Sequence, residues 1–178
     1  MVMMPTIVFI GFRGSGKSTL GRWLAEELSL PFIDTDSRVC ERLGFDTVTS
    51  AWKATGEEGW REAEFHVIPP LLGQDAVISL GGGAPMIAAI KQQLGSVTVV
   101  FNLTADEDVT LQRIELGDDR PVLSESNAQT RLDRLTTYAM LGTCGINTSG
   151  DIEETKAKIL DFLEHGHRIP KTGRPPLF

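Results

Sequence analysis

Residues 11–18 read Gly-Phe-Arg-Gly-Ser-Gly-Lys-Ser and match the phosphate-loop pattern GxxxxGK[ST] in full. Glycines let backbone N–H groups turn toward an anion, and the helix that follows adds the positive end of its dipole. Lys17 is spaced to reach the β- and γ-phosphates, and Ser18 offers a hydroxyl to Mg²⁺. An apolar segment precedes the loop and an amphipathic one follows it. The pattern therefore predicts a bound nucleoside triphosphate.

The phosphate loop does not by itself separate kinases from other nucleotide-binding proteins. GTPases share the loop, but this chain has no Asn-Lys-x-Asp segment for guanine and no apolar run that ends in Asp-x-x-Gly. At 178 residues it is also too short for most motor or recombinase ATPases. A small-molecule kinase is the class that remains.

Two aspartates, Asp34 and Asp36, lie two residues apart at the end of the short predicted strand 31–34. If the backbone is extended there, both side chains point to the same side. One carboxylate could hold Mg²⁺, and the other could accept a proton from an attacking hydroxyl. The alternative is a helix cap, because Asp36 also precedes a predicted helix.

Three glycines, Gly81, Gly82 and Gly83, follow the apolar segment 76–80. Glycines allow the backbone to approach a ligand closely. The alternative is a tight turn without a ligand.

Short β-type segments alternate with helical patterns along the whole chain. This alternation, without a hairpin signal, predicts a parallel sheet that is covered on both faces and binds ligands at the carboxyl ends of its strands. In the predicted helix 60–72, Pro69 and Pro70 should end or kink the helix. The predicted strands are 6–10, 31–34, 76–80, 97–103 and 143–147, and the main helices are 18–29, 38–43, 48–55, 60–72, 85–94, 105–116, 128–140 and 151–164.

Composition narrows the class of protein. Hydrophobic residues make up 41% and charged residues 23%, as expected for a soluble globular domain. A net charge of −7 disfavours nucleic-acid binding, and no apolar run approaches the roughly 20 residues of a membrane helix. Residues 1–10 lack a basic segment and are interpreted as a first strand rather than a signal peptide, and the two unpaired cysteines favour the cytoplasm.

The order of motifs resembles the shikimate kinase family over nearly the whole chain, from Thr6 to about Leu163. It runs GFRGSGKSTLG, FIDTD, GEEGWREAE, SLGGGA and DDRPVL. The resemblance implies a three-layer α/β/α sandwich, a P-loop kinase fold with a five-stranded parallel sheet in the order 2-3-1-4-5, substrate-binding helices and a mobile lid. It also implies ATP- and Mg²⁺-dependent phosphorylation of the 3-hydroxyl of shikimate, a step of chorismate and aromatic amino-acid biosynthesis.

On the nucleotide side, the resemblance assigns roles to single residues. Arg113 matches the arginine beside adenine, and Arg120 resembles the lid arginine that closes on the transferring phosphate. Asp34 looks like the aspartate near Mg²⁺, together with Ser18. The implied nucleotide-binding residues are Gly14, Ser15, Gly16, Lys17, Ser18, Thr19, Arg113 and Arg120, and the implied catalytic residues are Lys17, Asp36 and Arg120.

On the acceptor side, Asp36 resembles the aspartate that contacts the substrate hydroxyls and acts as the base. Arg61 resembles the arginine that grips the shikimate carboxylate, and Glu64 looks like its supporting acid. Gly82 and Gly83 look like backbone donors to the substrate. A second carboxylate-binding arginine is expected four residues before a tyrosine, which Arg134 and Tyr138 satisfy; Arg131 is the alternative.

The chain departs from the family pattern in three places. Trp52 and Trp60 stand where phenylalanine is usual, and either reshape the pocket or simply pack in the core. The stretch from Arg120 to Arg134 is shorter than expected, and its Arg-x-Pro-x-Tyr lacks the proline. The loop 148–150 lacks the basic residues often found near adenine.

One domain is predicted over residues 1–166, with a substrate-binding segment at about 34–62 and a lid at about 117–127. Residues 167–178 are expected to form a flexible tail, and the protein is expected to be a monomer. One rival is a kinase for another small polyol acid, such as gluconate, which the context of Arg61 argues against. The other is a nucleotide-binding protein without catalysis, which the intact Lys17, Asp34, Asp36 and Arg120 argue against.

Overall fold

A computed structural model describes residues 6–117 and 128–166 of the chain. Its five strands form one parallel sheet in the order β2-β3-β1-β4-β5, so the order expected from the family resemblance is confirmed. The central strand β1 leads directly into the phosphate loop. The strands are β1 (Ile7–Gly11), β2 (Phe32–Asp34), β3 (Val77–Ser79), β4 (Val99–Thr104) and β5 (Cys144–Asn147).

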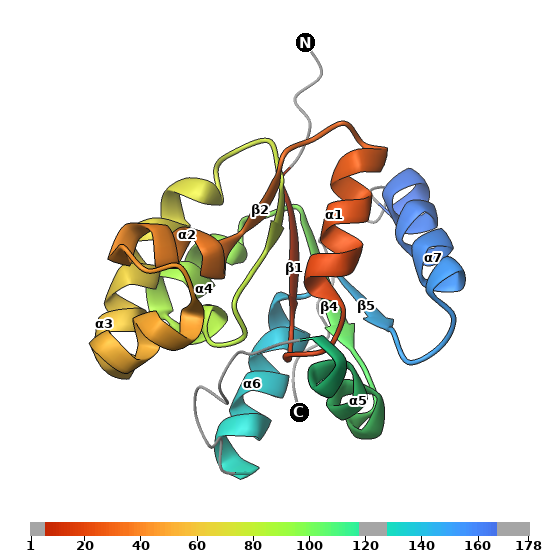
Figure 1. Cartoon of the computed structure of the whole chain (residues 1–178). Helices are drawn as coiled ribbons and strands as arrows, with labels where there is room; N and C mark the ends of the chain where they lie inside the picture. Colours follow the sequence, from red (N-terminus) through yellow and green to blue (C-terminus); the bar gives the residue numbers. More distant parts are fainter. Residues whose placement is uncertain (1–5, 118–127, 167–178) are drawn as a thin grey trace.

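Helices lie on both sides of this sheet. Figure 1 shows α1 and α7 together on one side, and α2, α3 and α4 grouped on the other. The helical elements are α1 (Lys17–Glu27), α2 (Thr35–Leu43), α3 (Val48–Leu71), the short 3₁₀ turn η1 (Ala84–Met86), α4 (Ala88–Leu94), α5 (Glu107–Gly117), α6 (Ala128–Leu141) and α7 (Ile152–His165).

The sheet separates two apolar clusters, because successive side chains of a strand point to opposite faces. On β1, Ile7 and Phe9 pack with α1 and α7, and the ring of Phe9 stacks on Phe101 of β4 at 5.1 Å. Val8 and Ile10 belong to the other cluster, with residues of α3, α4 and α6. All four β1 side chains are at most 1% exposed. A central strand buried on both faces is typical of a three-layer α/β/α sandwich, and that prediction is confirmed.

The element α3 contains both of the helices that the sequence predicts in this part of the chain. The sequence predicts separate helices over 48–55 and 60–72, and the element Val48–Leu71 does consist of two helices that meet at a kink, where Gly56 has the non-helical angles φ 66° and ψ −174°. The second helix ends at Leu71, one residue after Pro70, as expected from the two prolines. Both prolines lie in the last turn of the helix, and neither has a backbone N–H to donate. The carbonyls of Phe65 and His66 therefore lack their helical hydrogen bonds, and because both residues are exposed, water can bond to these carbonyls instead.

A third, smaller apolar cluster joins α2 to α3. It contains Val39 and Cys40 of α2 together with Val48, Ala51, Trp60 and Ala63 of α3. This packing fixes the two helices that carry Asp36 and Arg61. Among the described helices, none has both the length and the apolar character needed to cross a membrane.

Candidate active site

A cleft of about 910 Å³ lies at the carboxyl ends of the strands. Its walls come from the phosphate loop, the ends of β2 and β3, and the helices α3, α5 and α6. Every predicted site residue within the described part of the chain lines it, whereas Arg120 lies outside the described residues, as does most of the predicted lid. The predicted residues in the cleft are Gly14, Ser15, Gly16, Lys17, Ser18, Thr19, Asp34, Asp36, Arg61, Glu64, Gly82, Gly83, Arg113 and Arg134.

The ammonium group of Lys17 bonds to the backbone at the start of the phosphate loop. The Nζ atom of Lys17 donates to the carbonyls of Gly11 and Phe12, at 2.9 Å each. Gly14 has φ +78°, and a Cβ atom there would come within 2.8 Å of the backbone oxygen of Thr110 in α5. A side chain at position 14 would therefore be strained and would clash. The loop has the shape that an anion-binding cradle at a helix N-terminus requires.

Asp34, rather than Asp36, caps the helix α2. Its Oδ1 atom accepts hydrogen bonds from the backbone N–H groups of Asp36, at 3.0 Å, and of Ser37, at 3.3 Å. An extended backbone from Asp34 to Asp36 was the condition for both side chains to point to one side, and it is not met, because α2 begins at Thr35. Asp36 sits in the first helical turn instead, and both aspartates still line the cleft.

The second carboxylate oxygen of Asp34 lies beside the phosphate loop. Oδ2 of Asp34 accepts from the hydroxyl of Ser18 at 3.0 Å, and the hydroxyl of Ser79 lies 3.4 Å from that of Ser18. Over residues 6–117 and 128–166 no cluster of three or more His, Cys, Asp or Glu side chains is placed to hold a metal. Mg²⁺, however, is often held by one or two carboxylates together with substrate phosphates and water. The oxygen donors of Ser18 and Asp34 fit that cation.

An ion pair between Arg61 and Glu64 lines the part of the cleft where the sequence analysis expects the phosphoryl acceptor. Nη1 of Arg61 lies 2.6 Å from Oε2 of Glu64, and Nη2 lies 3.6 Å from Glu57. Glu64 is only 1% exposed. Burial raises the pKa of Glu64 and the charge of Asp36 raises it further, while Arg61 opposes both effects. Asp36, Arg61 and Glu64 thus share one electrostatic environment.

Trp52 and Trp60, the two unusual aromatic residues, play different parts. Trp60 is 1% exposed and belongs to the cluster between α2 and α3, yet it also lines the cleft. Trp52 packs against it, with 6.0 Å between ring centroids, and the guanidinium of Arg61 lies 5.9 Å from the ring of Trp52. Trp60 therefore both packs in the core and shapes the pocket. Trp52 acts on the site by packing against Arg61.

The glycine segment after β3 is held from both sides. The hydroxyl of Thr35 accepts from the N–H of Gly81 at 3.0 Å, and the phenol of Tyr138 donates to the carbonyl of Gly82. A Cβ atom at Gly83 would collide with the guanidinium of Arg61. Glycine at position 83 therefore permits close approach of the backbone to Arg61, and the glycine segment also forms a turn, in which the N–H of Ala84 bonds to the carbonyl of Gly81 at 3.1 Å.

Tyr138→Phe should raise the KM for the phosphoryl acceptor roughly three- to tenfold, because a buried hydrogen bond of about 0.5–1.5 kcal/mol is lost and the Gly82 carbonyl is left without its donor. Tyr138 is 1% exposed, and burial raises its pKa to about 12, so the phenol stays protonated at neutral pH. The KM for ATP should stay within about twofold. Steady-state kinetics with each substrate varied tests this, and an equal rise in both KM values would contradict it.

The two candidate arginines of α6 occupy different parts of the cleft. Arg131 stacks on the ring of Phe12 in the phosphate loop at 5.1 Å and lies 3.9 Å from Glu107 of α5. Arg134 acts electrostatically on the phenol of Tyr138, as Arg61 does. Of the two candidates, Arg134 is therefore the one whose charge, like that of Arg61, acts on Tyr138.

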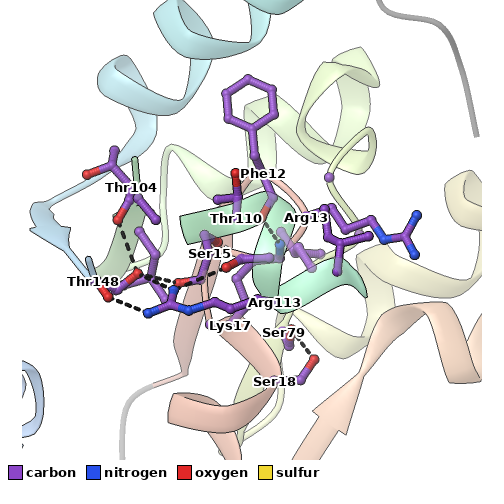
Figure 2. A pocket seen from close by; sticks show the side chains of 18 of the residues that line it. Phe12, Arg13, Ser15, Lys17, Ser18, Ser79, Thr104, Thr110, Arg113 and Thr148 are labelled. Carbon is purple, nitrogen blue, oxygen red and sulfur yellow. Dashed lines mark hydrogen bonds between the residues drawn. The ribbon is translucent and has the colours of Figure 1, made fainter. Parts of the chain in front are cut away.

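On the opposite side of the phosphate loop, Arg113 of α5 makes a dense set of hydrogen bonds. It donates to the carbonyl of Gly14 at 3.2 Å and to the hydroxyl of Thr148 at 3.0 Å. Figure 2 shows Arg113 reaching Thr148, whereas Arg13 extends the other way. Sequence reasoning did not single out Thr35, and it noted Thr148 only as part of the loop 148–150 expected near adenine. Single threonines form no motif, and both follow a predicted strand directly.

The model of the family described as shikimate kinase matches residues 13–164. A shikimate kinase of Corynebacterium jeikeium is 35% identical over 169 residues, which cover 91% of this chain and 90% of that protein. A shikimate kinase of Bradyrhizobium diazoefficiens is 36% identical over 133 residues, 74% of this chain, and the match spans 64% of that relative's own length.

Solved structures agree with these sequence matches. The shikimate kinase of Acinetobacter baumannii, solved in complex with shikimate, superposes with a TM-score of 0.79 at 30% identity, covering 94% of this chain and 96% of that one. The enzyme of Aquifex aeolicus gives a TM-score of 0.75 at 28% identity, covering 92% and 98%. On the matched family model, the relatives and the shared fold, the chain belongs to the shikimate kinase family.

Proposed function

We propose that the chain transfers the γ-phosphoryl group of ATP to the 3-hydroxyl of shikimate, giving shikimate 3-phosphate and ADP on the route to chorismate and the aromatic amino acids. The observation that carries this proposal is the single cleft that joins a phosphate loop to Asp36 and the Arg61–Glu64 pair. Membership of the family and a neighbour with bound shikimate support the choice of acceptor.

The acceptor has an anionic end and a hydroxyl end. Arg61 and Arg134 would hold its carboxylate, and a guanidinium can do so with two parallel hydrogen bonds that fix orientation. Glu64 would keep Arg61 in place. Asp36 would contact the hydroxyls and accept the proton of the attacking one, and Gly82 and Gly83 would offer backbone N–H groups.

The donor would lie along the phosphate loop. Backbone N–H groups of residues 14–19 and the ammonium of Lys17 would surround the β- and γ-phosphates, with Arg113 beside the base. Ser18 and Asp34 would hold Mg²⁺, which when bound neutralises charge on the phosphate oxygens. Arg120 would add positive charge where the phosphoryl group is transferred. Phosphoryl transfer depends mainly on such positioning and charge stabilisation.

We also propose that residues 1–166 form one kinase domain, in which the segment 34–62 binds the acceptor, and that the protein works as a cytoplasmic monomer. The segment 34–62 contributes to an apolar cluster between α2 and α3 that is separate from the two clusters on the sheet. This separate packing supports the proposal that the segment serves to bind the acceptor. The predicted lid at 117–127 and the tail at 167–178 lie almost wholly outside the described residues and stay predictions of the sequence.

A coupled ADP-release assay with shikimate, quinate and gluconate tests the proposed function. We expect ATP turnover that depends on shikimate and a kcat/KM for shikimate well above those for the other two acids. Preference for gluconate would favour the rival polyol-acid kinase. Binding of ATP without transfer to any of the three would favour a nucleotide-binding protein without catalysis.

A further inference from the structure

Thr148 occupies the point where three parts of the nucleotide side meet. It follows β5 directly and is 4% exposed. Its hydroxyl lies 2.9 Å from the carbonyl of Ser15 in the phosphate loop, 3.2 Å from that of Thr104 at the end of β4, and 3.0 Å from Nη1 of Arg113 on α5. Figure 2 shows these groups converging on one side of the loop.

The hydrogen-bonding roles at this point follow from the chemistry of the groups. A guanidinium only donates, so the hydroxyl of Thr148 accepts from Arg113 and has one proton left to give. That proton goes to the carbonyl of Ser15 or of Thr104. A serine hydroxyl could make the same bonds, whereas a valine of the same shape could make none of them.

The backbone of Thr148 is held independently of its hydroxyl. Its N–H donates to the carbonyl of Thr104 at 2.8 Å, and its own carbonyl accepts from Nη2 of Arg113 at 2.5 Å. Both terminal nitrogens of Arg113 therefore donate hydrogen bonds to Thr148. A guanidinium fixed in this way presents a planar face of constant orientation, on which an aromatic base can stack.

We propose that Thr148 is a positioning residue for the nucleotide base, and that it acts by fixing the guanidinium of Arg113 in the cleft. This inference rests on the proposed function, because that function places Arg113 beside the base. The hydroxyl of Thr148 also reaches the carbonyl of Ser15, but the groups proposed to hold the phosphates are backbone N–H groups and the ammonium of Lys17, which donates to Gly11 and Phe12. The hydroxyl of Thr148 should therefore matter for ligands with a base and little for a bare phosphate chain.

The test compares the binding of ADP and of pyrophosphate, each with Mg²⁺, by calorimetry. Thr148→Val should weaken ADP about tenfold or more, as expected when a hydrogen bond to a charged group is lost, and should change pyrophosphate binding less than about twofold. Thr148→Ser should restore ADP binding to near the wild-type value. Thr148→Ala removes the hydroxyl without adding a methyl group, and it carries the same expectation if the valine variant folds poorly.

Two controls make the result specific. Thr143→Val makes the same change just before β5, where the hydroxyl of Thr143 bonds only to the backbone of Val100, and it should leave ADP binding unchanged. Adding Thr148→Val to Arg113→Ala should cause no further loss, because the two residues act as one unit.

Equal weakening of pyrophosphate, an additive loss in the double variant, or unchanged ADP binding by Thr148→Val and Thr148→Ala would each overturn the inference. ADP binding does not depend on the acceptor. A chain that shows the expected ADP results but fails to phosphorylate shikimate would refute the proposed function and leave the role of Thr148 standing.

Discussion

Asp36→Asn is expected to lower kcat by about 10²–10⁴-fold while the affinity for ATP changes little. Asp36 lies in the first turn of α2 and lines the cleft together with the phosphate loop. Asparagine keeps the size of the side chain but cannot take the proton of the attacking hydroxyl. The contacts proposed for ATP come from residues 14–19, which this change does not touch.

Single-turnover and steady-state kinetics with shikimate, together with ATP binding, would measure the effect of Asp36→Asn. Asp46→Asn is the matched control, because Asp46 is exposed in the loop between α2 and α3 and should retain normal kcat. If Asp36→Asn raised only the KM for shikimate, Asp36 would bind the acceptor without acting as the base. A near-normal kcat would remove it from the chemical step.

The strand order and the phosphate loop could be predicted from the sequence because their signals are local or shared by a whole family. Residues 11–18 form a contiguous pattern with a fixed backbone shape. The apolar strands alternate with helices in a way that admits few topologies. Physical reasoning alone predicts a parallel sheet, and the family resemblance adds the order of its strands.

The predictions that depended on the local backbone were less successful. Asp34 and Asp36 were both placed in the cleft, but which of them caps α2 depends on where the helix begins, and helix ends are the least certain feature of a sequence. The gap predicted between the helices 48–55 and 60–72 narrows in the structure to a kink at Gly56, because local sequence does not fix where the two helices end.

The contacts that complete the site are long-range and carry no pattern. Thr35 meets Gly81 across 46 residues, and Tyr138 meets Gly82 across 56. The sequence places each of these residues near the end of a strand or on a helix face, but only the fold shows that Tyr138 reaches the carbonyl of Gly82. The hydrogen bonds of Thr148 to Arg113 and to Ser15 are long-range as well, so the sequence indicates the loop 148–150 but not these contacts.

Arg61→Ala should raise the KM for shikimate by about 100-fold, because a carboxylate loses a charge-assisted contact of about 1.5–3 kcal/mol and the orientation that the contact gives. An acceptor analogue without the carboxylate should show little change. If both acceptors lost the same factor, Arg61 would not contact the carboxylate. The KM for ATP serves as the internal reference, since Arg61 lies on the acceptor side of the cleft.

The same change should also cost stability through Glu64. Loss of one member of a fully buried pair costs about 3–5 kcal/mol, and the cost here should be smaller because the side chain of Arg61 is 24% exposed. The pKa of Glu64 already lies above its ordinary value of 4.5, and removing Arg61 takes away the influence that lowers it. Ionising Glu64 then opposes folding, so the free energy of unfolding of Arg61→Ala should fall as pH rises above 4.5 toward the folded-state pKa.

Arg61→Ala combined with Glu64→Gln separates the two roles of the ion pair. Glutamine carries no charge to bury, so the double variant should regain stability at pH 7 and lose the dependence on pH, as followed by denaturant unfolding at several pH values. It should not regain affinity for shikimate, because the arginine is still missing. Recovery of both properties together would mean that Arg61 acts on the acceptor only by keeping α3 folded, and that the carboxylate is held elsewhere in the cleft.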